Sequence, residues 1–177
     1  MQSPFSSRTT QFFLFLFILG GSIWFGSAVA RTIVGYDLFI PGTLTMKDQA
    51  EAVRIQTIRL HTLLASWTDI SFALFGLSGI ALIVRLRHLF RERGWMLMCS
   101  LLFLLMLPAG GWTAWEDYHA YTLFDRVTGV ALAPAEEIID VFLRRQQNVA
   151  FGVLSGLTGL SAVSLILIGA FRPLHRS

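Results

Sequence analysis

The sequence predicts an all-α integral membrane protein, in which four transmembrane helices form a bundle with helical extensions on the extracytoplasmic side. Hydrophobic residues make up 54% of the 177 residues and charged residues only 14%, whereas a typical soluble domain carries about 25% charged residues. The mean hydropathy is +0.62, and four apolar runs reach the length of about 20 residues that a membrane-crossing helix needs. A single domain, residues 1–177, fits this length.

The predicted spans cover residues 12–34, 60–84, 95–112 and 149–171. Arg31 lies near the end of the first span, Asp69 lies within the second, and Pro108 interrupts the third. Cys99 is the one cysteine, so no disulfide can form within the chain. The isoelectric point near 9.6 would suit nucleic acid if the basic residues formed an exposed stripe. They flank the apolar runs instead, which indicates membrane topology and no nucleic-acid partner.

The distribution of arginine and lysine predicts that both termini are cytoplasmic. With the N-terminus inside, seven basic residues fall on each side, but the inner segments are less than half as long as the outer ones. The inner loop 85–94, RLRHLFRERG, is especially dense in arginine, as the positive-inside rule requires. We expect a multi-pass protein of the cell membrane, which is the inner membrane in a bacterium. A cleaved secretory signal ending at Ala28-Val29-Ala30 is the alternative, but the apolar run continues to Val34.

The two outer segments, residues 35–59 and 113–148, are predicted to be helical and are called the outer crown below. In the first, Pro41-Gly42 indicates a turn, and Thr45 followed by Asp48 is a variant capping box. The second helix is therefore expected to begin near Met46 and to continue into the second span.

The second outer segment follows a similar plan. The third helix is expected to continue to about Arg126, with Gly129 as a stop signal, and Pro134 suits the first turn of a new helix that continues into the fourth span. Ala50-Glu51 and Ala135-Glu136 each precede an apolar stretch that leads to a basic residue. This similarity indicates two hairpins in a parallel repeat, although apolar sequences also match one another by chance.

Asp69 is the most informative residue, because an ionised carboxylate inside a span costs at least about 2.5–3.5 kcal/mol. Thr68 and Ser71 form a polar patch beside it, and His61 lies a little over two turns earlier on the same face. The side chain of Asp69 is expected to face the bundle interior. Two interpretations follow: a hydrogen-bonded carboxyl group that locks helix packing, which we favour, or a relay for protons or cations.

Small residues predict close helix packing. Gly152, Gly156 and Gly159 lie on the fourth span, and Gly76 and Gly79 lie on the second. Such spacing allows two backbones to approach closely. We expect the second and fourth helices to pack against each other within the chain, with dimerisation as the alternative.

No cofactor is predicted, but a metal ion and haem are alternatives to consider. Glu116 and His119 have Glu-x-x-His spacing on a predicted helix, and Glu137 and Asp140 could approach them to complete a metal site. Pairing of Glu116 and Asp117 with Arg144 and Arg145 is the favoured interpretation of these charges. A haem would need facing histidines, and only His61 and His119 offer a shallow site near the outer boundary.

The sequence contains no motif that identifies a reaction. The leading functional hypothesis is a non-enzymatic accessory or scaffolding subunit of a larger membrane complex. The outer crown would be its contact surface, because it is rich in Trp, Tyr and Arg, which are enriched at interfaces. Its partners would be the lipid bilayer and a membrane protein or a second copy of the chain. The alternative is a small transporter or a redox or metal carrier that uses Asp69, His61 and the Glu116/His119 patch.

Overall fold

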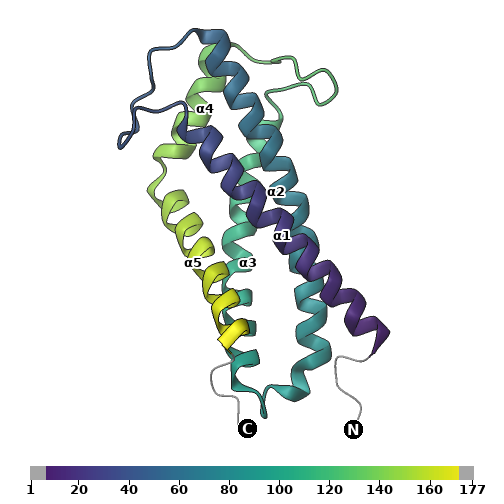
Figure 1. Cartoon of the computed structure of the whole chain (residues 1–177). Coiled ribbons are helices and arrows are strands. Elements are labelled where there is room, and N and C mark those ends of the chain that lie inside the picture. The colour runs from purple at the N-terminus through teal and green to yellow at the C-terminus, as the bar shows by residue number, and fades with distance from the viewer. Residues whose placement is uncertain (1–6, 172–177) are drawn as a thin grey trace.

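The computed structural model describes residues 7–171 (Figure 1). Its helices are α1 (Arg8–Tyr36), α2 (Glu51–Leu86), the short 3₁₀ helix η1 (Arg87–Leu89), α3 (Gly94–Tyr121), α4 (Ala135–Gln147) and α5 (Val149–Phe171). Within this part of the chain α1, α2, α3 and α5 are long and apolar enough to cross a membrane. The predicted all-α bundle with four spanning helices is therefore confirmed.

The four long helices run side by side, and α4 lies at one end of the bundle (Figure 1). α1 packs along α2, whereas α5 packs mainly on α3. The opposite end of the bundle holds the start of α1, the end of α5 and the loop after α2 (Figure 1). We call these two ends the α4 end and the basic-loop end. Arg172, His175 and Arg176, which entered the expected charge distribution at the C-terminus, lie outside the described residues.

Aromatic side chains fill the middle of the bundle. The ring of Trp24 on α1 stacks on Phe75 of α2 with centroids 5.7 Å apart, and Phe75 meets Phe103 of α3 edge to face at 5.2 Å. The contact between α1 and α2 depends on Gly20, because a Cβ there would lie 2.8 Å from the backbone nitrogen of Phe75. These contacts fix α1, α2 and α3 relative to one another.

The outer crown has an apolar core of its own. Residues from the loop after α1, from α2, from the loop after α3 and from α4 contribute to it: Leu38, Phe39, Ile58, Phe124, Ile138 and Phe142. α4 is amphipathic, so its buried face carries Ile138 and Phe142 while Glu137 and Asp140 are exposed. Burial of this apolar face holds α4 across the end of the bundle.

The loops after α1 and α3 form the same hairpin at positions 85 residues apart. Phe39 pairs with Met46, and Phe124 pairs with Ala131. The backbone hydrogen bonds also match in register: Ile40 donates to Thr45 as Asp125 donates to Val130, and Lys47 donates to Leu38 as Leu132 donates to Leu123. This agreement supports the parallel repeat. The offset between the two loops is the same as that between Ala50-Glu51 and Ala135-Glu136.

These hairpins correct three predicted helix boundaries. α2 begins at Glu51 and not near Met46, because residues 38–47 pair as a hairpin and Thr45 makes no helix cap. α3 ends at Tyr121 and not near Arg126, for the same reason. Pro134 precedes α4 as its cap position and does not lie in the first turn.

The predicted continuity of the crown helices with the spans is confirmed for α2 but wrong for the fourth span. α4 ends at Gln147, and Asn148 adopts an extended backbone conformation. The Asn148 side-chain oxygen then accepts hydrogen bonds from the backbone nitrogens of Ala150 (3.0 Å) and Phe151 (3.3 Å), which is the geometry of an N-cap. A new helix, α5, therefore starts in a different direction (Figure 1).

Candidate functional site

Four buried polar side chains from four different helices meet near the α4 end. Arg31 of α1 forms a bidentate ion pair with Asp117 of α3, with Nη1 2.6 Å from Oδ2 and Nη2 bound to Oδ1. Arg145 of α4 places Nη2 2.7 Å from the same Oδ1. The Nε of Arg31 donates to Nε2 of His61 on α2 at 3.2 Å. We call these four residues the charge cluster.

The charge cluster contains two guanidinium groups and one carboxylate. Asp117 is 1% exposed, and in the described part of the chain neither arginine contacts a second carboxylate. Burial lowers the pKa of Arg145 to about 10, and repulsion by Arg31 adds to this, while attraction to Asp117 opposes it. Arg145 thus stays protonated at neutral pH, and the cluster keeps an excess of one positive charge.

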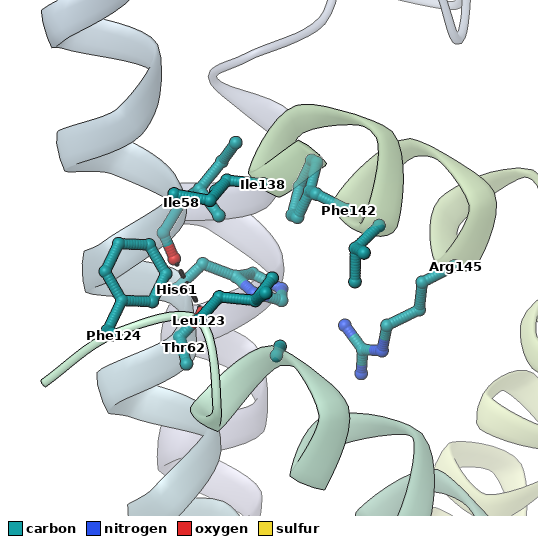
Figure 2. A pocket seen from close by; sticks show the side chains of 10 residues that line it. Ile58, His61, Thr62, Leu123, Phe124, Ile138, Phe142 and Arg145 are labelled. Atoms are coloured by element: carbon teal, nitrogen blue, oxygen red, sulfur yellow. Dashed lines mark hydrogen bonds between the residues drawn. The ribbon is translucent and has the colours of Figure 1, made fainter. Parts of the chain in front are cut away.

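His61 acts as a hydrogen-bond acceptor in this arrangement. A guanidinium group can only donate, so Nε2 of His61 is unprotonated in its bond to Arg31. The imidazole also packs edge to face on Phe142 at 5.1 Å. Figure 2 shows Ile58, Ile138 and Phe142 around His61, with Arg145 extending from α4 beside them. The space among these residues measures about 10 Å³, which is too small for a ligand.

Asp69 faces the bundle interior, as predicted. Its Oδ2 accepts a hydrogen bond of 2.6 Å from the Tyr121 hydroxyl at the end of α3. Two residues of the predicted polar patch make other contacts: the Thr68 hydroxyl lies 3.1 Å from that of Ser27 on α1, and the Ser71 hydroxyl donates to the Trp67 carbonyl at 2.6 Å. Thr68 thus contacts a neighbouring helix, Ser71 bonds its own helix, and Tyr121 is the partner of Asp69.

A cavity of about 610 Å³ lies between α1 and α5 and reaches the charge cluster. Its polar end is lined by Arg31, His61, Asp69 and Arg145. Its remaining wall is largely apolar and includes Trp24, Phe25, Phe72 and Phe151 together with small residues of α5. The volume falls in the range of about 300–1,000 Å³ that is usual for small-molecule sites.

The cavity is open toward the side of the bundle. Val29 and Ile33 of α1 line it and are exposed. α5 has only Thr158 and Ala162 buried, because it packs mainly on α3 and not on α1. A molecule dissolved in the lipid could thus enter between α1 and α5 without crossing the crown.

The predicted packing of the second and fourth spanning helices through glycine is wrong. A Cβ at Gly152, Gly156 or Gly159 would meet nothing within 4 Å, and all three glycines line the cavity. Gly76 and Gly79 do allow close packing, but against α3: a Cβ at Gly76 would lie 3.3 Å from Leu107, and one at Gly79 would overlap the Phe103 ring. Small residues on α5 therefore leave space instead of filling it.

The residues suggested for a metal site do not come together. In residues 7–171 no group of three or more His, Cys, Asp or Glu side chains is close enough to hold a metal ion. His119 is exposed beside Trp115, and Asp140 pairs with Arg144 on the exposed face of α4, while Glu116 and Glu137 join neither pair. His61 is buried in the charge cluster, so His61 and His119 do not face each other as haem ligands would.

Sequence reasoning missed the charge cluster, although it named its parts. Asp117 pairs with Arg145 as expected, but Arg144 pairs with Asp140. In the sequence, Arg31 stands out only as a charge near the end of a span. A buried arginine needs a carboxylate at the same depth, and that requirement was the available signal for pairing Arg31 with Asp117.

Comparison with known proteins identifies no relative: no protein family matches this chain, and no characterised protein or solved structure is significantly similar to it.

Proposed function

We propose that this protein binds an amphipathic small molecule from the bilayer, as a non-enzymatic carrier or receptor. The observation that carries the proposal is the cavity between α1 and α5, which joins a charged end to apolar walls and opens sideways. A molecule with a polar head and an apolar tail matches this distribution, because each part would contact groups of its own kind. Asp69 and His61 belong to the binding wall in this proposal.

The position of the cavity relative to the bilayer supports the same function. With the basic loop 85–94 in the cytoplasm, the α4 end faces outward, and Arg31 lies near the outer end of the first span. The head of a bound molecule would then lie near the outer interface and its tail in the hydrocarbon layer. This is the orientation that an amphiphile already has in the outer leaflet.

The proposal is tested by saturable binding to the purified full-length protein in a mild neutral detergent. A pyrene-labelled long-chain alcohol serves as the probe. Gly156→Phe directs a large side chain into the cavity from a position where an added Cβ meets nothing within 4 Å. We expect saturable binding to the unmodified protein and its loss in Gly156→Phe.

Gly26→Phe is the matched control for this experiment. Gly26 also has open space around its Cβ position and is exposed, but it does not line the cavity. Its substitution should leave probe binding unchanged. Equal binding by both variants, or partitioning without saturation, would refute the proposed function.

An accessory subunit remains the second candidate function. Its support is the surface of α5, where Val153, Leu157 and Leu160 are exposed and the glycines have open space beside them. A helix of a larger complex could occupy this side of the bundle. Mild solubilisation followed by cross-linking from position 157 tests it: a stoichiometric partner protein would favour the subunit, and a lipid adduct would favour the carrier.

A further inference from the structure

Arg145 lines the polar end of the cavity and keeps one donor unpaired. The residue is 7% exposed, and its Nη2 is bound to Asp117. Its guanidinium carbon lies 4.1 Å from the centroid of the Phe151 ring, which fixes the plane of the group. The Nε atom, however, is buried and has no hydrogen-bond partner. A buried donor without an acceptor is costly, and more so when the group is charged.

The charges around this donor favour an anion. Arg31 and Arg145 line the cavity, whereas Asp117, the carboxylate that they share, does not. Asp69 is the acidic residue on the cavity wall, and it accepts from Tyr121 without an ion pair to either arginine. A ligand with one negative charge would neutralise the excess positive charge of the cluster.

We infer that the ligand is a long-chain carboxylate, whose head group binds Arg145 beside Arg31 and whose tail lies along the apolar wall toward Trp24. The inference rests on the proposed function and adds the chemical class of the ligand. A carboxylate fits because it accepts from guanidinium groups in planar, charge-assisted hydrogen bonds. One carboxylate also matches the one unpaired positive charge, whereas a dianionic phosphate monoester would exceed it.

The test compares two competitors of equal chain length, hexadecanoate and hexadecan-1-ol, for displacement of the pyrene-labelled alcohol at pH 8. A hydrogen bond to a charged group predicts that hexadecanoate binds about 10- to 100-fold more tightly than the alcohol. Arg145→Gln should remove most of this preference.

Arg144→Gln is the matched control. Arg144 is the neighbouring residue on α4, and its side chain is 79% exposed and paired with Asp140. Arg144→Gln removes the same charge as Arg145→Gln, but at a residue that does not line the cavity. The preference for hexadecanoate should therefore persist in this variant. Should Arg145→Gln fail to elute as a monodisperse protein, Arg145→Lys replaces it: the lysine keeps the charge without the planar donor set of the guanidinium group, so the preference for hexadecanoate should shrink.

Equal displacement by the two competitors in the unmodified protein would overturn the inference. The inference would also be overturned if Arg145→Gln and Arg144→Gln showed the same preference for hexadecanoate over hexadecan-1-ol. Where Arg145→Lys replaces Arg145→Gln, the same comparison is made with Arg145→Lys. In both cases the proposed function would stand if the probe still binds saturably and Gly156→Phe abolishes that binding. Absence of saturable probe binding in the unmodified protein refutes the proposed function itself.

Discussion

Replacement of Asp117 by asparagine is expected to destabilise the protein by about 3–5 kcal/mol, because breaking a buried ion pair leaves an uncompensated charge. Asp117 is 1% exposed and binds both arginines of the charge cluster. Asparagine has nearly the same shape and keeps an oxygen acceptor, so the loss would come from charge and not from packing. Arg31 and Arg145 would then be two buried cations without a carboxylate between them.

The measurement is reversible unfolding in mixed micelles, in which a denaturing anionic detergent is titrated into a neutral one and helix content is followed by circular dichroism. Asp140→Asn is the control, because Asp140 forms an exposed ion pair with Arg144 one turn away. Such pairs on a helix surface contribute only about 0.3–0.5 kcal/mol. The free energies of unfolding of the two variants should therefore differ by several kcal/mol, although each variant removes one carboxylate.

A double-mutant cycle tests the assignment of this cost to the cluster. Arg145→Met removes one of the two cations, so Asp117→Asn combined with Arg145→Met should destabilise by at least about 0.5 kcal/mol less than the sum of the single variants. A cost of Asp117→Asn within about 0.5 kcal/mol of that of Asp140→Asn, or strict additivity in the cycle, would show that the buried pair does not stabilise the fold.

Three further predictions concern the hairpins and the topology. Gly42 has φ +80° and open space around its Cβ position, so Gly42→Ala should cost about 1–2 kcal/mol from backbone strain alone, measured by the same unfolding assay. The backbone and hydroxyl of Thr128 hold the pKa of Asp125 below its usual range. A carbon-13 titration should show that these contacts persist above about pH 4 and are lost as the pH falls through that lowered pKa. A midpoint at or above the ordinary aspartate value of about 3.9 would contradict this. A reporter that fluoresces only in the cytoplasm, fused after Ser177, should be bright, and a dark fusion with an active periplasmic reporter at that site would refute the proposed orientation.

The spans could be predicted because hydropathy is a local property of the chain. The interior direction of Asp69 could be predicted as well, since a short carboxylic side chain in mid-span cannot reach the interface. The start of α2 is predicted wrongly from the Thr45 and Asp48 capping pattern, because the backbone of Thr45 accepts from Ile40 and that of Lys47 donates to Leu38. Tertiary pairing across a hairpin overrides such a local signal.

The candidate site could be predicted only in part, for a related reason. The bond between Arg31 and Asp117 joins residues 86 positions apart, and it depends on how α1 and α3 are rotated about their axes. The cavity depends on the preference of α5 for α3 over α2, and small-residue spacing on α5 contains no information about which helix it will meet. The sequence shows which charged and polar residues are present, but the packing of the helices decides which of them meet.

The separation between Arg31 and Asp117 also has a consequence for biosynthesis. At a translation rate of about 5–20 residues per second, roughly 4–17 s pass between synthesis of the arginine and of its carboxylate. His61 is made earlier, 30 residues after Arg31, but it accepts a hydrogen bond without compensating the charge. Arg31 lies five residues before the end of α1, so its long side chain can extend to the water interface during this interval. We therefore expect α1 and α2 to enter the membrane with Arg31 turned outward, and Arg31 to move inward only after α3 has been synthesised and inserted.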